Sequence, residues 1–153
     1  MATLDISSIK NFVKLTDRIG TSGQPREQHF ANIAAQGYRW VINLAMPDHA
    51  DALINEDALV TSEGMAYLHI PVNFKAPQKS QVRFFCQLMS QLHNEKIFVH
   101  CIMNYRVSAF MFHYLRWVEG WPEADARSPM FGSWQPDAVW QDLLSWTAED
   151  IGL

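Results

Sequence analysis

Three short apolar runs recur along the chain, each rich in the β-branched and aromatic side chains that favour extended backbone. Proline ends the first run, and glycine precedes the second. The runs are YRWVINLAM at 38–46, MAYLHIPV at 65–72 and KIFVHC at 96–101. We predict that they form three strands of a buried sheet.

The segments around these strands carry apolar residues at helical spacing. In the segment 77–94, for example, Val82, Phe85 and Met89 fall on one face of a helix. Gly37 and Gly64 close two other segments, because glycine readily takes the left-handed conformation that ends a helix. The predicted helices cover 26–37, 50–63, 77–94, 106–119, 122–127 and 136–149.

The alternation of strands and helices predicts an α/β fold with a mainly parallel central sheet flanked by helices. The length of 153 residues suits one domain covering 1–153, and no linker, repeat or low-complexity tract divides it. In parallel sheets, ligands bind beyond the carboxyl ends of the strands. The third predicted strand ends at His100 and Cys101, directly before a helix, so we expect the chemistry of the protein there.

The composition is that of an ordinary globular protein, with 48% apolar and 18% charged residues. The net charge of −4 provides no basic patch, so we expect neither nucleic acid nor a membrane surface as a partner. No run approaches the roughly 20 apolar residues of a membrane span, and Asp5 stands where a secretion signal would be basic, which predicts a cytoplasmic protein. The histidines and cysteines show no paired metal spacing, so we predict no metal and no cofactor.

The stretch HCIMNYR, residues 100–106, brings a cysteine and an arginine to the start of a helix. Backbone amides that lead into a helix can turn inward and bind an anion, with the helix dipole behind them. The same field lowers the pKa of a thiol from about 8.5 towards about 3.5–7.5, so Cys101 could be a thiolate at neutral pH. Arg106 stays charged and can hold two oxygens of a phosphate. The predicted anion-binding residues are Ile102, Met103, Asn104, Tyr105 and Arg106.

In this interpretation, the Cys101 thiolate attacks the bound group and forms a covalent intermediate, while Arg106 and the amides stabilise the transition state. His100 would fix the loop through its ring hydrogen bonds, and Asn104 suits a tight loop because asparagine tolerates left-handed backbone. The simpler interpretation is that Cys101 is a buried, unreactive thiol, since cysteine is often buried for packing alone. We predict that role for Cys86, which lies on the apolar-faced helix 77–94.

The sequence FVHCIMNYRVSAF, with TSGQP upstream and YLHIPV between, resembles the bacterial branch of the cysteine-dependent tyrosine and dual-specificity phosphatase superfamily. It is most similar to small phosphatase-like proteins of proteobacteria, which are similar to the domain found in beta-lactamase-hybrid proteins. The likeness runs from Thr21 to about Trp140. It implies a phosphocysteine mechanism, with Cys101 as nucleophile and Arg106 as phosphate binder. The implied substrate is a phosphoprotein or a phosphorylated small molecule.

The chain departs from the superfamily pattern within the loop. That pattern has five residues between cysteine and arginine and then a serine or threonine, whereas this chain has four, IMNY, and Val107 follows Arg106. Ser108 stands at the family's distance from Cys101, so two alignments compete. We favour the shorter loop with Arg106 retained, because a thiolate buried beside Val107 would lack compensation for its charge. Ser108 is then a candidate to assist departure of the thiolate.

A loop of six residues from cysteine to arginine is also the length found in rhodanese-like sulfurtransferases. Their smaller cradle suits a persulfide better than a tetrahedral phosphate. A sulfurtransferase is therefore the alternative function, together with a phosphate-binding module that has little catalytic activity.

Phosphatases of this type need a carboxylic acid to protonate the leaving oxygen. In dual-specificity relatives the acid follows the strand that corresponds to YLHIPV, where this chain has Asn73, and an amide cannot give up a proton. Asp48 is the best substitute, and its alternative role is the N-cap of the next helix. Asp137 is a third candidate, with a place in the first turn of the last helix as its alternative. We therefore expect weak activity, mainly on activated aryl phosphates.

Overall fold

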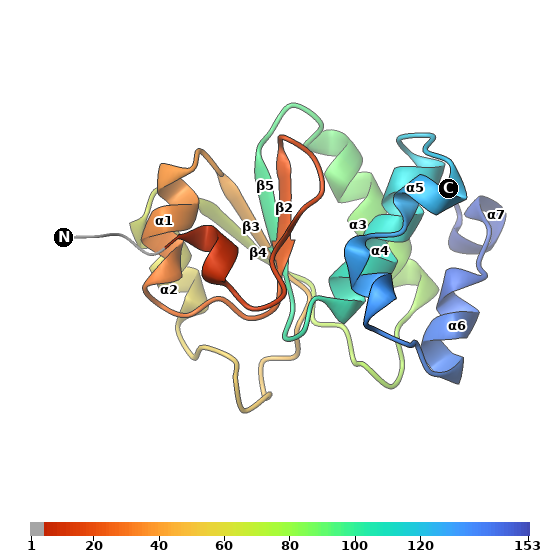
Figure 1. The fold of residues 1–153 in the computed structure, drawn as a ribbon, viewed down its shortest axis with the longest axis horizontal. Coiled ribbons are helices and arrows are strands. Elements are labelled where there is room, and N and C mark those ends of the chain that lie inside the picture. Colours follow the sequence, from red (N-terminus) through yellow and green to blue (C-terminus); the bar gives the residue numbers. More distant parts are fainter. Residues whose placement is uncertain (1–4) are drawn as a thin grey trace.

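The computed structural model describes residues 5–153, and a five-stranded sheet lies at its centre (Figure 1). The strands follow the order β1-β2-β5-β3-β4, in which β1 is antiparallel to β2 and each other neighbouring pair is parallel. The strands are β1 Val13–Lys14, β2 Ile19–Ser22, β3 Trp40–Asn43, β4 Ala66–His69 and β5 Ile97–His100. The predicted α/β fold with a mainly parallel sheet is confirmed.

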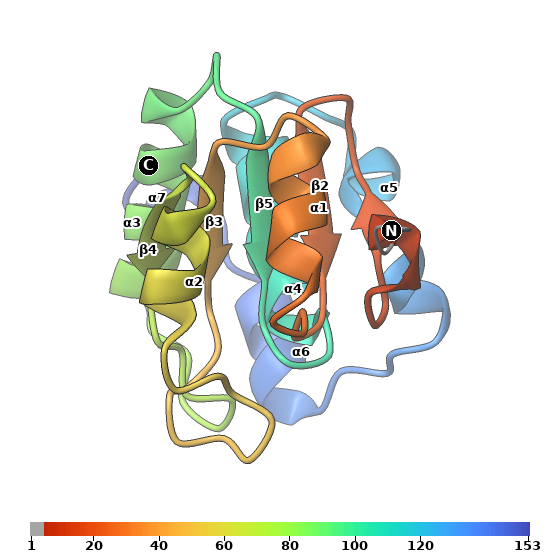
Figure 2. The same cartoon turned by 90° about the vertical axis from the view of Figure 1, so that its left-hand side faces the viewer.

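Helices cover both faces of the sheet, as the two views together show (Figures 1 and 2). One face carries η1 Ile6–Ser8, α1 His29–Ala35 and α2 Glu56–Ser62. The other carries α3 Lys79–Gln91, α4 Tyr105–Trp117, α5 Glu123–Ala126, η2 Pro129–Gly132, α6 Ala138–Leu144 and α7 Ala148–Ile151. Within residues 5–153, no helix has the length and apolar character needed to cross a membrane.

The two faces of the sheet bury separate apolar clusters, because successive side chains of a strand point to opposite faces. On β5, Phe98 belongs to the cluster on the α1 and α2 side, where it meets Tyr38 edge-on with 5.4 Å between ring centroids. Its neighbours Ile97 and Val99 belong to the larger cluster on the α3 and α4 side. Burial on both faces explains why this strand is a continuous apolar run in the sequence.

Strands β1 and β2 are missing from the sequence prediction, which has the strands 38–46, 65–72 and 96–101 alone. The sequence of β2, IGTS, holds a single large apolar residue, yet all four residues are buried between β1 and β5. A side chain at Gly20 would not fit, since a Cβ there would come within 2.6 Å of the Tyr38 hydroxyl. The packing against Tyr38 therefore requires a glycine in β2, and because β2 has mainly small residues, its sequence lacks the apolar pattern that predicts a strand.

Two predicted helices differ from the structure for local reasons. The predicted helix 50–63 begins only at Glu56, because the preceding residues form turns. Asn55 therefore holds the N-cap position, and the alternative N-cap role of Asp48 is wrong. The predicted helix 136–149 is two helices, because Thr147 caps α7 by accepting a hydrogen bond from the Asp150 amide at 3.1 Å. The other predicted helices are confirmed: α4 begins one residue before its predicted start, and the remaining ends fall inside the predicted ranges.

The parallel strands end in register at one edge of the sheet. His100 at the end of β5 pairs with Ser22 of β2 and Asn43 of β3, and Asn43 in turn pairs with His69 of β4. The loops that follow these four strands therefore meet at the same edge. This edge holds the candidate site.

Candidate active site

Cys101 lies at the junction of β5 and α4, in the wall of a pocket of about 460 Å³. The side chain is only 1% exposed, so the pocket is its route of access. Three loops supply the other lining residues: Met46, Asp48 and His49 after β3, Asn73, Phe74 and Lys75 after β4, and Ile102, Met103, Tyr105 and Arg106 beside Cys101. The structure thus brings Cys101, Arg106, Asp48 and Asn73 together.

The carbonyl groups of residues 101–104 are all held by hydrogen bonds from neighbouring groups. The partners are, in order, the His100 ring at 3.1 Å, the Gln24 amide at 3.0 Å, the Asn11 side chain at 2.9 Å and the Ser108 hydroxyl at 2.6 Å. Among residues 5–153, by contrast, no group accepts a hydrogen bond from the backbone amides of 102–106. These five amides remain available to an anion at the start of α4, as the sequence predicts.

Asn104 gives the loop its sharp turn into α4. Its backbone is left-handed, with φ of +69°, which asparagine tolerates better than most residues. Its side-chain amide donates to the Asn11 carbonyl at 2.8 Å and to the Thr21 hydroxyl at 3.2 Å. Since Asn11 donates back to Met103, the two asparagines fasten the loop to the N-terminal segment. No sequence pattern indicates this role for Asn11.

Gly23 allows the segment after β2 to lie against the reactive loop. A Cβ at this position would come within 2.3 Å of the Ile102 carbonyl oxygen. The close approach lets the next residue, Gln24, donate its amide to the same carbonyl. The segment SGQP, residues 22–25, therefore supports the loop directly.

Arg106 is the charged group of the pocket that the structure holds most firmly. Its guanidinium donates to the Val72 carbonyl at 2.9 Å and lies over the Phe74 ring, 5.6 Å from the centroid. The side chain is 6% exposed, and its buried Nε has no hydrogen-bond partner among the described residues. Val107 lies in the apolar core instead. The pocket therefore contains Arg106, as the alignment with four residues between cysteine and arginine predicts. The Nε–H of Arg106 donates to no group among the described residues.

Ser108 lies behind the loop and does not line the pocket. Its hydroxyl donates to the Asn104 carbonyl at 2.6 Å and accepts from the Ser128 hydroxyl at 3.1 Å. This geometry gives Ser108 a role in holding Asn104.

His100 connects the loop to a buried carboxylate that sequence analysis missed. Its Nδ1 lies 3.1 Å from the Cys101 carbonyl oxygen, and its Nε2 lies 2.6 Å from Oε2 of Glu56. Glu56 is 3% exposed at the first position of α2. Burial raises the pKa of Glu56, but the charge of His100 and hydrogen bonds from His100 and Gln24 outweigh it, so the pKa lies below its usual value. An acidic residue in the polar stretch INEDA gives no sign of burial.

The three candidate acids occupy different positions. Asp48 lines the pocket with Cys101 and is otherwise exposed. Asn73 also lines the pocket, and its side-chain oxygen accepts from the Lys75 amide at 2.9 Å. Asp137 caps α6 by accepting from the Trp140 amide at 3.1 Å. Asp48 is thus the candidate carboxyl group that shares the pocket with the thiol.

The second cysteine has no such surroundings. Cys86 is 0% exposed on α3 and packs in the apolar cluster, where burial raises the pKa of its thiol to about 12. The prediction of a core thiol is confirmed. Among residues 5–153, no three His, Cys, Asp or Glu side chains lie close enough together to hold a metal ion.

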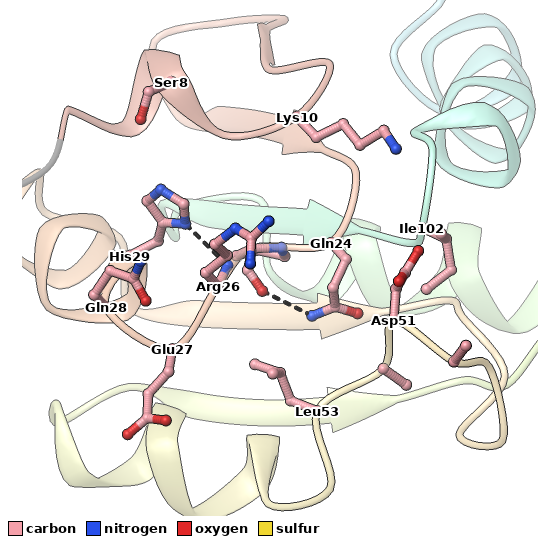
Figure 3. A pocket seen from close by; sticks show the side chains of 13 residues that line it. Ser8, Lys10, Gln24, Arg26, Glu27, Gln28, His29, Asp51, Leu53 and Ile102 are labelled. Atoms are coloured by element: carbon pink, nitrogen blue, oxygen red, sulfur yellow. Dashed lines mark hydrogen bonds between the residues drawn. The ribbon is translucent and has the colours of Figure 1, made fainter.

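A second pocket, of about 760 Å³, is lined by Ile102 together with residues of the segments 8–10, 24–29 and 50–53 (Figure 3). Side chains of both charges reach its rim, among them Lys10, Arg26 and Asp51. Gln24 is among its lining residues, and its side chain donates to the Pro25 carbonyl at 3.0 Å (Figure 3). Ile102 of the reactive loop therefore lines both this pocket and the pocket that holds Cys101.

Residues 11–126 match the family described as a DSP-PTPase phosphatase fused to NAD+ kinase. The chain belongs to this phosphatase family. The match covers the sheet, Cys101 and Arg106, and it confirms the resemblance that the loop sequence suggests.

Relatives support the same assignment. A candidate phosphatase of the DUF442 group from Shewanella putrefaciens CN-32 is 30% identical, with a TM-score of 0.84 over 95% of this chain and 96% of that chain. A beta-lactamase hydrolase-like protein from Agrobacterium fabrum is 30% identical over 93 residues, which are 58% of this chain and 21% of the relative. The chain thus spans about a fifth of the curated relatives it matches. TpbA from P. aeruginosa, solved in complex with phosphotyrosine, shares the fold at 19% identity, with a TM-score of 0.63 over 82% of this chain and 73% of that chain.

Proposed function

We propose that residues 1–153 form one domain that hydrolyses phosphate monoesters through a phosphocysteine intermediate. The observation that carries the proposal is the loop 101–106, whose carbonyls are held by other groups while its amides stay available beside Cys101 and Arg106. Such a ring of donors fits the oxygens of a phosphoryl group and stabilises the negative charge that develops during transfer.

In the first step, the Cys101 thiolate attacks phosphorus and forms a sulfur–phosphorus bond. The bond to the leaving oxygen breaks, and that oxygen leaves as an anion or takes a proton from Asp48. Arg106 and the loop amides hold the three other phosphoryl oxygens throughout. In the second step, water attacks phosphorus, the sulfur–phosphorus bond breaks, and inorganic phosphate leaves while Cys101 returns to the thiolate.

The pocket favours an aryl ester as substrate. Phe74, Met103 and Tyr105 supply apolar walls beside Cys101, and Tyr105 stacks on Trp134 with 4.9 Å between ring centroids and an angle of 2°. Lys75 adds a second cation. The binding of phosphotyrosine by the distant fold relative TpbA is consistent with this preference. A phosphoprotein and a phosphorylated small molecule both remain within this substrate class.

A sulfurtransferase is the second candidate, because four residues between Cys101 and Arg106 make a smaller ring than the superfamily pattern provides. In that reaction, the thiolate would take sulfur from thiosulfate and form a persulfide, and sulfite would leave. The persulfide sulfur would then pass to cyanide or a thiol.

One side-by-side assay separates the candidates. The purified protein is given p-nitrophenyl phosphate or thiosulfate with cyanide, and release of p-nitrophenol or thiocyanate is followed. We expect only the phosphate ester to turn over, with inhibition by vanadate and no turnover by Cys101→Ser. Thiocyanate release without p-nitrophenol would reject the phosphatase. If the protein binds vanadate and releases neither product, it is a phosphate-binding module without catalytic activity.

A further inference from the structure

Glu56 links the two segments that hold the start of the reactive loop. Its Oε2 lies 2.6 Å from Nε2 of His100, and its Oε1 accepts from the Gln24 side chain at 2.9 Å. His100 in turn contacts the Cys101 carbonyl oxygen at 3.1 Å, and the Gln24 amide donates to the Ile102 carbonyl at 3.0 Å. One carboxylate therefore holds both residues that restrain the first two loop carbonyls.

Both nitrogens of the His100 ring lie against possible hydrogen-bond acceptors. Nδ1 faces a carbonyl oxygen and Nε2 faces a carboxylate, and both of these groups are acceptors when Glu56 is ionised. A neutral imidazole has only one N–H. Its other nitrogen would then face an acceptor oxygen with no hydrogen between the two atoms. A doubly protonated ring would satisfy both contacts and would place a positive charge next to Cys101. A carboxylate at 2.6 Å compensates that charge in a fully buried position.

The other groups around Glu56 are consistent with an ionised carboxylate. Burial and then the charge of Glu56 raise the pKa of Tyr67 on β4 to about 12. His69, also on β4, adds a favourable charge that lowers the pKa of Glu56, after the larger contributions of burial, His100 and Gln24. Asp57 is the exposed acidic neighbour on α2. Tyr67, His69, Asp57 and Glu56 all line one further pocket beside the sheet edge.

We infer that Glu56 is a positioning residue, which holds His100 doubly protonated and thereby keeps the Cys101 and Ile102 carbonyls turned away from the bound anion. The inference rests on the proposed phosphatase function for its catalytic effect. Without the carboxylate, the His100 ring keeps one proton, which either ring nitrogen can carry, and the form with the hydrogen on Nε2 no longer donates to the Cys101 carbonyl. The carbonyl of Cys101 can then rotate, and the amide of Ile102, in the same peptide unit, rotates with it.

The test uses the ring nitrogens of His100 as a readout that is independent of activity. Nitrogen-15 NMR of the protein labelled in its histidine rings shows at neutral pH whether each nitrogen carries a hydrogen. We expect two protonated nitrogens for His100 in the unmodified protein and one in Glu56→Gln, a substitution that keeps the size of the side chain. Asp57→Asn is the matched control, since it removes one charge from the same helix turn, and it should leave His100 unchanged.

Kinetics give the second readout. We expect kcat for p-nitrophenyl phosphate to fall on the order of 10- to 100-fold in Glu56→Gln, because small misplacement of stabilising groups costs rates of this size. Vanadate binding should weaken in parallel, and Asp57→Asn should match the unmodified protein in both measurements. A purely structural role for Glu56 would lower the melting temperature and leave kcat per folded molecule and the His100 ring unchanged.

The outcomes separate the inference from the proposed function. A single protonated nitrogen on His100 in the unmodified protein would overturn the inference, and this result needs no variant to fold. Unchanged kcat, vanadate binding and His100 protonation in folded Glu56→Gln would overturn it as well. If the unmodified protein hydrolyses no phosphate ester, the phosphatase proposal fails. Loss of the His100 proton and weaker vanadate binding in Glu56→Gln would still support the positioning role.

Discussion

The two cysteines of the chain are buried to almost the same extent and have opposite surroundings. Cys86 is 0% exposed and lies among apolar side chains of the α3 and α4 layer. Cys101 is 1% exposed and stands at the first position of a loop with five available amides and a buried guanidinium. Burial by itself therefore does not distinguish a core thiol from a candidate nucleophile.

The difference lies in the polar groups that each cysteine meets. Apolar burial disfavours the thiolate, and this effect raises the pKa of Cys86 to about 12. At Cys101, N–H donors, the α4 dipole and Arg106 can all stabilise negative charge in the adjoining pocket. Asn11, Gln24 and Ser108 donate hydrogen bonds to the carbonyls of this loop, and Glu56 accepts one from Gln24. Within the described residues, no comparable network of polar contacts surrounds Cys86.

Serine substitution at each cysteine tests the comparison most strongly. Cys101→Ser should lower kcat for p-nitrophenyl phosphate on the order of 10⁴-fold or more, because it removes the nucleophile. Cys86→Ser should leave kcat unchanged and lower the free energy of unfolding by about 1–3 kcal/mol, since it buries a hydroxyl without a partner. Steady-state kinetics and urea unfolding of both variants measure these effects. Loss of turnover in Cys86→Ser with normal folding would break the comparison.

Arg106→Lys should reduce kcat/KM by about 100- to 1,000-fold, because a lysine loses the paired N–H groups that hold two phosphoryl oxygens. Vanadate binding should weaken in the same variant, as isothermal titration calorimetry can measure. Arg116→Lys, on the far part of α4, is the matched control and should retain full activity. Equal activity of the two variants would show that Arg106 serves only to hold Val72 and Phe74 in place.

Substitutions at the candidate acid positions, Asn73 and Asp48, should change how strongly kcat depends on the leaving group of the ester. We expect the unmodified protein to hydrolyse aryl phosphates weakly and phosphoserine peptides hardly at all, because general acid catalysis is worth about 10²–10⁴-fold and Asn73 cannot supply it. Asn73→Asp should raise kcat most for esters with poor leaving groups. Asp48→Asn should lower kcat only if Asp48 supplies the proton. Efficient hydrolysis of phosphoserine by the unmodified protein and by Asp48→Asn would place the acid elsewhere.

The apolar layer that holds Cys86 should respond to acid by losing stability. Burial lowers the pKa of His113 on α4 to about 4, and the neutral ring donates to the Leu143 carbonyl at 2.7 Å and accepts from the Trp117 indole at 2.9 Å. The unfolded chain binds this proton near pH 6.5, so between about 6.5 and 4 it binds more protons than the folded chain. The free energy of unfolding should therefore fall as pH decreases through this window, by about 3 kcal/mol in total.

Urea unfolding at several pH values measures this effect. His113→Gln supplies a neutral donor and acceptor, and we expect it to flatten the dependence on pH. His93→Gln, at an exposed position, is the control and should keep the steep dependence. An unchanged slope in folded His113→Gln would show that another group takes up the proton.

The sequence predicted the parts of the molecule that have a periodic or local signal. Strands β3, β4 and β5 are continuous apolar runs because both faces of the sheet are covered. The place of Cys101 and Arg106 followed from a strand that ends directly before a helix. Asparagine tolerates left-handed backbone, which suits Asn104 to a tight loop, and in the structure its φ is +69°.

The sequence did not predict the parts that depend on contacts between distant segments. Strand β2 is made of small residues because Tyr38 leaves no room at Gly20. Asn11 and Glu56 reach the loop from 92 and 44 residues away, from polar stretches that resemble any exposed surface. The wrong N-cap role of Asp48 arose because α2 begins later than its apolar spacing suggests. Tertiary contacts decide all of these positions.

The most direct test of the account is to trap the covalent intermediate. The protein is mixed with excess p-nitrophenyl phosphate, quenched during turnover, digested, and mapped by mass spectrometry. We predict one phosphoryl group on the peptide that contains Cys101, none on the peptide that contains Cys86, and none anywhere in Cys101→Ser. Turnover of the ester with no phosphoryl group on Cys101, or retained turnover in Cys101→Ser, would contradict the account.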